Sequence, residues 1–388
     1  MTAIRLGVLL VIASGFTLAI SSLPAIQKPA FVIPEYPTSD QDSEPVLEAA
    51  FISGNNTREV HSPTAIELIN GDIRAFWYGG TREGSKDTSI YSRMLNRADN
   101  SWSDIEEVMT RQTVARETHR YIRKLGNPVA LVNGDEIWLF FVSVSVGGWA
   151  GSVINLSISE DNGTTWGPVK RLISSPFINI STLVKNAPLL TEKGDVILPA
   201  YHEFLGKFAE LLQLDSSGNI TNKYRISHGR EAIQPFLLPA DTTHATAFMR
   251  NTSARQPGKL WFSRSQDNLA DWTALEALTL SNPDAAITVV QLNMPDELLL
   301  VFNNHPTEKE DISMAHRSDS SAAWQLVYRF ETAVGSENIH NPFSYPFLLQ
   351  THDGNFHLFY TWKRKHIKHV YFNRAALLKM LATAGPES

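Results

Sequence analysis

Short runs of apolar and β-branched residues, each preceded by a polar turn, recur along the chain from about residue 50 onward. The clearest runs lie at residues 72–80, 136–146, 297–304 and 355–362. This order of turn and strand is typical of β-hairpins. Helical periodicity is weak until residues 374–383, so the pattern predicts an all-β domain that ends in one short helix.

One of the turns contains a complete sequence motif. Residues 159–166 read Ser-Glu-Asp-Asn-Gly-Thr-Thr-Trp, which matches S-x-D-x-G-x-T-W, the Asp-box. Asp161 and Asn162 are residues that bond to their own backbone in tight turns, and Gly163 accepts a positive φ. Trp166 can bury its ring beneath the turn. Such a box closes a hairpin in a repeated four-stranded unit, so it predicts a β-propeller.

Weaker copies of the motif recur at intervals. They end at Trp102, Trp272 and Trp324, and residues 215–218 form a further eroded turn. The spacing corresponds to units of about 50–60 residues over residues 50–375, which predicts six blades, with five or seven as the alternatives.

The first 48 residues differ from the rest. Arg5 precedes an apolar run at residues 6–20, which is short for a membrane-spanning helix and typical of a signal peptide. An uncleaved anchor is the alternative. We therefore divide the chain into a signal peptide or membrane anchor (1–25), a linker (26–48), a propeller (49–375) and a C-terminal tail (376–388). The expected location is periplasmic or secreted, with membrane contact only through residues 6–20.

Composition excludes several classes of function. The net charge is −6 without a long basic block, so nucleic acid is not an expected partner. The chain has no cysteine, which excludes disulfides, thiolate metal sites and a cysteine nucleophile. No dinucleotide, phosphate or metal motif is present, so we expect no cofactor and no metal. The basic run 363–369 is interpreted as a solvated strand.

Four stretches contain candidate chemistry at strand ends. His61-Ser-Pro is followed by a turn and a strand, and residues 78–87 contain both Arg82 and Asp87. Gln234 precedes a proline, and Arg250 ends the strand that follows it. The last stretch reads Phe343-Ser-Tyr345-Pro and again precedes a turn and a strand.

With these motifs and the Asp-box, the chain resembles the BNR/Asp-box sialidase-like family over about residues 55–372. Proteins of this family are six-bladed propellers in which three arginines bind the substrate carboxylate. A tyrosine paired with a glutamate is the nucleophile, and an aspartate is the general acid. The resemblance implies an exported exo-α-sialidase-type hydrolase that binds an acidic glycan. Tyr345 corresponds to the nucleophile, Asp87 to the acid, Arg82 to a neighbouring arginine and Arg250 to one triad arginine.

The chain also departs from the family pattern. His61 stands in place of the first triad arginine, and Gln234 stands in place of the glutamate that assists the tyrosine. The third arginine is absent from residues 303–311, where the polar side chains include Asn304, His305, Lys309 and Asp311. A glutamine cannot accept a proton, and a phenol has an ordinary pKa near 10, so Tyr345 needs a nearby cation to ionise. The chain is therefore expected to be a divergent branch with an incomplete arginine triad.

Two loops add candidates for substrate binding. Arg123, Lys124 and Asn127 lie in a basic turn that either holds an anionic sugar or is merely solvated. Trp149 lies in a glycine-rich loop and is either a platform for a sugar or part of its own blade.

His202 and Glu203 follow an apolar strand and are a candidate acid/base pair. Adjacent residues of a strand point to opposite faces, so only one of them is expected to face a cleft.

Three other functions remain open from the sequence: another acidic-glycan hydrolase on the same fold, a uronate-polysaccharide lyase and a glycan-binding propeller. A uronate lyase would use His61 or His202 with Tyr345 as base and acid, while an arginine neutralises the carboxylate. A glycan-binding propeller without turnover is favoured by Gln234 and the missing arginines. The lyase differs from the hydrolase in its unsaturated product, which absorbs ultraviolet light.

Overall fold

The computed structural model describes residues 28–33, 43–175, 179–227, 231–254, 257–292, 296–333 and 342–384, together with positions 14 and 229. Except for position 14, the predicted signal or anchor segment at residues 6–20 lies outside the described residues. Within the part of the chain that is described, no helix is long and apolar enough to span a membrane.

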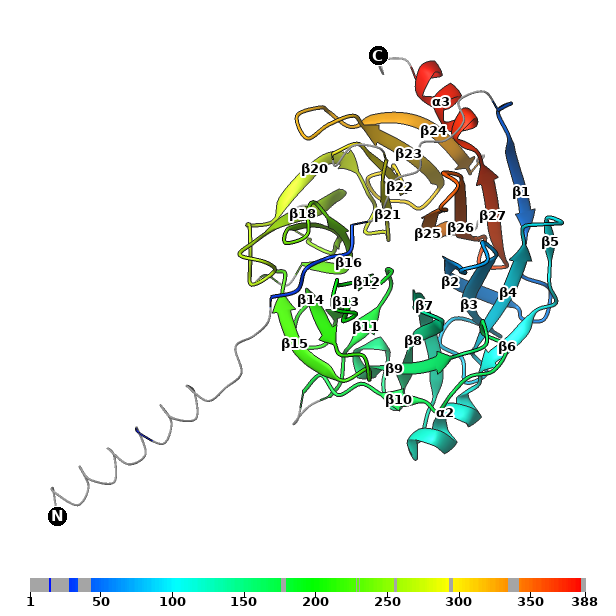
Figure 1. Cartoon of the computed structure of the whole chain (residues 1–388), viewed down its shortest axis with the longest axis vertical. Coiled ribbons are helices and arrows are strands. Elements are labelled where there is room, and N and C mark those ends of the chain that lie inside the picture. The colour runs from blue at the N-terminus through cyan, green and yellow to red at the C-terminus, as the bar shows by residue number, and fades with distance from the viewer. Residues whose placement is uncertain are drawn as a thin grey trace, which may run out of the picture.

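The strands form six antiparallel sheets arranged as blades around a common axis (Figure 1). The predicted all-β, six-bladed propeller is therefore confirmed.

Blades 1 to 3 follow one another along the chain. Blade 1 consists of β2 (Glu59–Glu67), β3 (Ile73–Gly80), β4 (Ser89–Asn96), β5 (Ser101–Trp102) and β6 (Glu106–Met109). Blade 2 consists of β7 (Lys124–Asn133), β8 (Glu136–Val144), β9 (Ser152–Ser159) and β10 (Lys170–Arg171). Blade 3 consists of β11 (Leu183–Val184), β12 (Leu189–Leu190), β13 (Val196–His202), β14 (Phe208–Leu214) and β15 (Ile220–Arg225).

Blades 4 to 6 complete the ring. Blade 4 consists of β16 (Ala232–Pro239), β17 (Ala245–Asn251), β18 (Lys259–Gln266), β19 (Asp271–Trp272) and β20 (Glu276–Ser281). Blade 5 consists of β21 (Thr288–Gln291), β22 (Leu298–Phe302), β23 (Asp311–Arg317) and β24 (Gln325–Thr332). Blade 6 consists of β25 (Phe343–Gln350), β26 (Phe356–Trp362), β27 (His366–Phe372) and, from the start of the domain, β1 (Leu47–Phe51).

The Asp-box forms the turn that its sequence predicts. Ser159 Oγ donates to Asp161 Oδ1 at 2.8 Å, and Asp161 Oδ1 accepts from Thr165 N at 2.8 Å. Gly163 has φ +86°, and Trp166 packs edge-on against Phe76 of blade 1 with 6.0 Å between ring centres.

All five predicted turns lie between the third strand and the outer strand of a blade. Blade 6 has no such hairpin because its outer strand, β1, comes from the beginning of the domain and pairs with β27. This explains why five turns accompany six blades.

The core lies between the blades rather than inside each one. Among the described residues, the six clusters of buried apolar side chains lie mainly between neighbouring blades, so the ring is closed by packing as well as by β1. Phe31, from the range expected to be a linker, is fully buried in the cluster between blades 3 and 4.

Between residues 43 and 384, the described helical segments are α2 (Arg111–Thr118), the 3₁₀ turn η1 (Trp149–Gly151) and α3 (Arg374–Thr383). The helix predicted at 374–383 is confirmed as α3, which packs beside β24. The apolar pattern did not predict α2, because Val114 is its only buried residue. Its local signal is the N-cap Thr110, whose side chain accepts a hydrogen bond from Thr113 N.

Candidate active site

Four inner strands contain the same backbone irregularity at the same end of the propeller. Ser62, Asn127, Gln234 and Tyr345 have φ values of +52°, +45°, +53° and +55°, and each precedes a proline. In all four blades the pairing with the second strand shifts at this point. A β-bulge redirects side chains. Because a bulge interrupts the pairing, a proline there removes no hydrogen bond between the two strands. These four residues therefore occupy equivalent positions around the axis. Three of them, Asn127, Gln234 and Tyr345, are predicted site residues.

A buried tyrosine that sequence reasoning missed connects two of these bulges. Asn127 Nδ2 and Gln234 Nε2 lie 3.3 and 3.4 Å from Tyr201 OH, and both donate to it. The backbone oxygen of Gln234 accepts from Asn186 Nδ2 at 2.9 Å. Burial raises the pKa of Tyr201, so its hydroxyl stays protonated. Gln234 of blade 4 and Asn127 of blade 2 thus hold the hydroxyl group of Tyr201, which belongs to blade 3, in a fixed position.

On the opposite side of the ring, His61 lies between two tyrosines. Its ring stacks on Tyr78 with 5.5 Å between centres and meets Tyr345 edge-on at 6.4 Å. Its Nε2 lies 3.5 Å from Glu59 Oε2. Burial lowers the pKa of His61, partly opposed by Glu83, so the imidazole is neutral at neutral pH.

Glu83 is the second residue that the sequence did not single out. Tyr78 OH donates to its Oε1 at 3.4 Å, and a guanidinium nitrogen of Arg364 lies 3.5 Å from its Oε2. Glu83 N donates to Glu59 Oε2 at 2.8 Å, which fixes the loop. Because Glu83 lies between Arg82 and Asp87 in one polar loop, residue type alone did not distinguish it.

Cations gather on the blade 4 and blade 5 side. Arg250 Nε donates to Asp284 Oδ1 at 2.5 Å, and this carboxylate raises the pKa of Arg250 against the effect of burial. Burial and the neighbouring Arg250 lower the pKa of Lys309 to about 8. Burial raises the pKa of Glu203, which Arg250 partly opposes. Arg250 therefore lies close enough to Lys309 and to Glu203 for its charge to affect the pKa of both.

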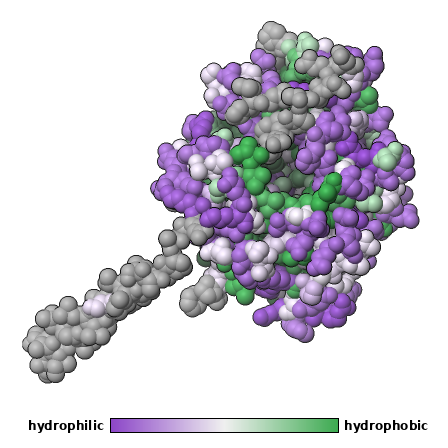
Figure 2. Space-filling model, in the orientation of Figure 1, coloured by the Kyte–Doolittle hydropathy of each residue, from purple (hydrophilic) through white to green (hydrophobic). Residues whose placement is uncertain are grey.

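Tyr345 lies partly exposed among these groups. Burial and the charge of Glu83 raise its pKa to about 12, while Arg250 and Arg364 act in the opposite direction. The phenol is therefore protonated at neutral pH. Figure 2 shows hydrophobic atoms around the hollowed centre of one face of the ring, within a hydrophilic surround.

Lys185 is the third missed residue. Between β11 and β12, the chain has two more residues than the paired stretch of β13, and this bulge contains Lys185. The side chain is 1% exposed, and within the described residues its Nζ has no hydrogen-bond partner. Nζ lies 5.9 Å from the ring centres of both Tyr345 and Phe347. Burial lowers the pKa of Lys185 to about 7.

The basic turn and the glycine-rich loop meet in the wall between blades 1 and 2. Lys124 Nζ lies 3.7 Å from the ring centre of Trp149, and Trp149 meets Tyr78 edge-on at 6.2 Å. A Cβ at Gly126 would lie 2.5 Å from Trp149 Cη2, so only glycine permits this contact. Trp149 is partly buried, and Arg123 points to solvent.

Three predicted residues lie outside this group. Arg82 and Asp87 are exposed on the β3–β4 loop. Asp87 Oδ2 accepts from Thr81 Oγ1 at 2.6 Å and from Thr81 N at 3.0 Å, and these bonds lower the pKa of Asp87. His202 pairs with Glu210 at 2.7 Å within blade 3. Of the adjacent pair 202 and 203, Glu203 is thus the one near Arg250.

The described residues include no group of three or more His, Asp or Glu side chains arranged to hold a metal ion.

Solved structures share this fold at low sequence identity. A protein of unknown function from Dyadobacter fermentans gives a TM-score of 0.66 at 15% identity, covering 84% of this chain and 98% of that one. The Trypanosoma rangeli sialidase gives 0.67 at 12%, covering 87% of this chain and 61% of that one. The NanB sialidase of Streptococcus pneumoniae gives 0.63 at 10%, covering 92% and 72%. This chain thus spans less than two thirds of the T. rangeli enzyme, and these likenesses show the fold alone.

No sequence among the curated proteins matches the chain. The family model described as BNR repeat-like domain matches residues 71–358, which is most of the propeller. The chain therefore belongs to the BNR repeat-like domain family, with a propeller of the sialidase type.

Proposed function

We propose that the chain is an exported glycoside hydrolase that removes a terminal acidic sugar from a glycan, in the manner of an exo-α-sialidase. One observation carries the proposal: Tyr345 lies at the bulge of an inner strand at one end of the axis, with its ring centre 6.4 Å from that of His61, where Glu83, Arg250, Glu203 and Arg364 also affect the pKa of its phenol. A tyrosine nucleophile in a retaining glycosidase is an attested exception to the use of two carboxylates. Export would follow from residues 6–20, which would also provide the only membrane contact if they are not removed.

The cations are suited to hold the sugar carboxylate. The charges of Arg250 and Arg364 both act to lower the pKa of Lys309 and that of Tyr345, which supports a common location. Lys309 lies in the stretch where the resemblance calls for the third arginine. An ammonium binds a carboxylate as a point charge rather than through two parallel hydrogen bonds. We expect weaker orientation of the substrate than an arginine triad provides.

The reaction would proceed in two displacements. Tyr345 Oη bonds to the anomeric carbon while the bond from that carbon to the leaving oxygen breaks and the leaving oxygen takes a proton. Glu83, the charged group with the largest effect on the pKa of Tyr345, is proposed to accept the phenol proton. Water then displaces the tyrosine and completes the hydrolysis.

Two carboxylates are candidates for the general acid. The resemblance assigns Asp87, whereas the raised pKa of Glu203 suits a group that must hold a proton near neutral pH. The hydrogen bonds from Thr81 favour the ionised form of Asp87. We therefore propose Glu203 as the acid in the free protein, with Asp87 as the alternative.

A uronate lyase is the second candidate. The neutral imidazole of His61, 6.4 Å from the ring centre of Tyr345, supports it, because a neutral histidine can remove the proton beside a carboxylate. The third candidate is a glycan-binding propeller without turnover, which the glutamine at 234 favours.

One pair of assays separates the three. The purified chain is incubated with a fluorogenic α-sialoside and, separately, with uronate-containing polysaccharides. Release of the fluorophore supports the hydrolase, and a rise in ultraviolet absorbance from an unsaturated product supports the lyase. Binding of either glycan without product identifies a non-catalytic propeller and rejects the proposed hydrolase.

A further inference from the structure

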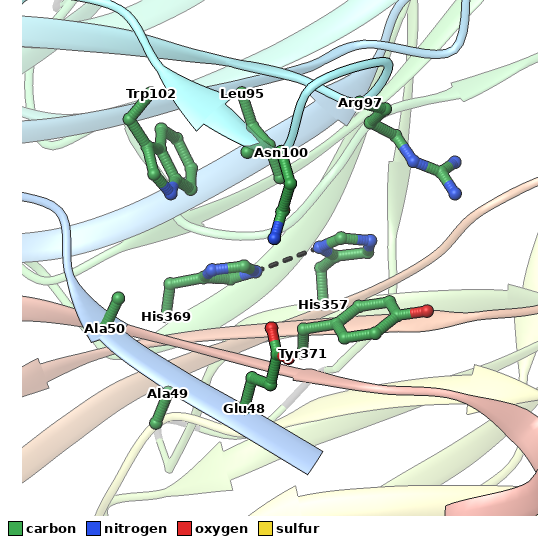
Figure 3. Close-up of a pocket in the computed structure, with 10 residues that line it drawn as sticks. All are labelled: Glu48, Ala49, Ala50, Leu95, Arg97, Asn100, Trp102, His357, His369 and Tyr371. Carbon is green, nitrogen blue, oxygen red and sulfur yellow. Dashed lines mark hydrogen bonds between the residues drawn. The ribbon is translucent and has the colours of Figure 1, made fainter. Parts of the chain in front are cut away.

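A cavity lies between blades 6 and 1, and its lining includes residues of their outer strands β1 and β5 (Figure 3). Its volume is about 390 Å³, which is within the range of small-molecule sites. Side chains from β1, from the β4–β5 turn and from β26 and β27 line it. It is separate from the candidate active site. His357 lies four positions along β26 from Thr361, whose Oγ1 accepts from Ser62 N at 3.2 Å near the axis. Four strand residues span about 13 Å.

Two buried histidines form the floor of this cavity. His357 Nδ1 and His369 Nε2 lie 2.9 Å apart, and the two rings stack with 5.1 Å between centres. His357 is 2% exposed, and its Nε2 has no hydrogen-bond partner among the residues described. His369 is 6% exposed and not solvated as the basic run 363–369 suggested, because it faces blade 1.

This polar pair is costly for a purely structural contact. A buried polar group destabilises the fold unless it is hydrogen-bonded, and here one imidazole nitrogen is unpaired. The adjoining contacts between blades 6 and 1 are made by apolar side chains such as Phe359. An apolar pair at 357 and 369 would therefore pack without this cost. The polar pair beside a cavity indicates a surface adapted to a ligand.

The remaining walls define the chemistry of that ligand. Trp102 meets His369 edge-on at 5.3 Å, and Tyr371 lies tilted against His357 at 5.1 Å, so flat aromatic groups lie on two sides. Asn100 projects toward the histidine pair, and Glu48 lies on the opposite wall (Figure 3). A pyranose ring combines an apolar C–H face, which packs on an aromatic ring, with hydroxyl groups that amides and carboxylates bind.

Charge distinguishes this cavity from the active site. Its one cation, among the described lining residues, is Arg97, which is already paired with Asp353 and lies 3.6 Å from Glu67. Glu48 is a carboxylate that would repel an acidic sugar. We propose that the cavity between blades 6 and 1 is a second binding site, for an uncharged sugar unit. A branched glycan held at both sites would be retained by avidity.

Ligand-observed NMR with the full chain tests the proposal. The probes are methyl β-galactoside, methyl β-glucoside and methyl N-acetyl-β-glucosaminide, with choline and sialic acid as comparison compounds. Asn100→Gly removes the amide without straining the turn, because Asn100 has φ +55°. Asn162→Gly is the matched control, since Asn162 has φ +56° in the Asp-box of blade 2 and does not line the cavity.

We expect saturable binding of at least one neutral glycoside, weakened about fivefold or more in Asn100→Gly by loss of a hydrogen bond. Binding should be unchanged in Asn162→Gly and in Tyr345→Phe, which separates this site from the proposed catalysis. The proposal is wrong if no neutral glycoside binds, if Asn100→Gly binds as the wild type does, or if choline binds and the sugars do not.

Discussion

Lys185 Nζ lies 5.9 Å from the ring centre of Tyr345, in a bulge that places a buried amino group near the candidate nucleophile. No hydrogen-bond partner within the described residues compensates the charge that this group carries when protonated. A buried unpaired charge lowers the stability of the folded state. Lys185 is therefore a place where the fold buries an ionisable group at a measurable cost.

Replacing Lys185 by methionine should stabilise the protein in a pH-dependent way. The pKa of Lys185 is about 7 in the folded state against an ordinary 10.5. Between these values the unfolded state binds more protons, so the wild type gains stability as pH rises, by up to about 1.4 kcal/mol per pH unit. Lys185→Met lacks this dependence, so its advantage should be largest below pH 7 and shrink toward pH 10.

Urea unfolding of both proteins at pH 6, 8 and 9.5 measures this difference. Lys223→Met is the matched control, because its side chain is 42% exposed and it should change stability little at any of these pH values. An advantage of Lys185→Met that stays constant with pH would contradict the lowered pKa.

Lys309 should set the alkaline limit of substrate binding. Its pKa of about 8 means that the positive charge is lost above that pH, and the attraction for a substrate carboxylate is lost with it. The KM of the wild type should therefore rise above pH 8. Lys309→Arg should keep KM low at higher pH, because arginine remains charged. The check is KM measured from pH 6 to 9.5, and equal alkaline profiles of the two proteins would exclude this role.

The general acid can be assigned by a pair of isosteric substitutions. If Glu203 donates the proton, Glu203→Gln should lower kcat by about 10²–10⁴-fold on a substrate with a poor leaving group. The loss should be small on a substrate with an activated leaving group, which departs without a proton. Asp87→Asn should show the smaller effect on both substrates. The reverse pattern would assign the acid to Asp87, as the resemblance suggests.

Gly163 of the Asp-box should tolerate no side chain. It has φ +86°, and a Cβ there would lie 2.8 Å from Arg74 Nε. Gly163→Ala should therefore destabilise by about 2–4 kcal/mol, combining backbone strain with overpacking. Gly134→Ala is the control, with φ +61° and no atom within 4 Å, so it should lose only about 1–2 kcal/mol. Thermal unfolding compares them, and equal losses would show that contact with Arg74 contributes nothing.

The fold could be predicted because its signals are local. Asp161, Gly163 and Trp166 lie within one turn. Each of the apolar runs that the sequence indicated follows a polar turn and forms the second strand of its blade. The length of the repeat then predicted the number of blades, and this inference required no knowledge of contacts between distant residues. Helix α2 was missed because a helix with one buried residue produces no apolar periodicity.

The site was only partly predictable because its groups come from different blades. Motif position indicated Gln234, Arg250 and Tyr345, which do share one end of the axis. Glu83 and Tyr201 could not be found, because their contacts with Arg364 and Asn127 cross from one blade to another and the sequence does not encode them locally. Lys185 was missed for another reason: in the sequence it is an ordinary lysine after a short strand, and only the bulge buries it.

Turnover of a fluorogenic α-sialoside by the purified chain and by Tyr345→Phe is the most direct test of the proposed hydrolase. We predict release of sialic acid by the wild type and a fall of about a thousandfold or more in the variant, since removing a nucleophile eliminates the covalent route. Circular dichroism of both proteins checks that the propeller is intact. Absence of release by the folded wild type, or equal release by Tyr345→Phe, would contradict the account.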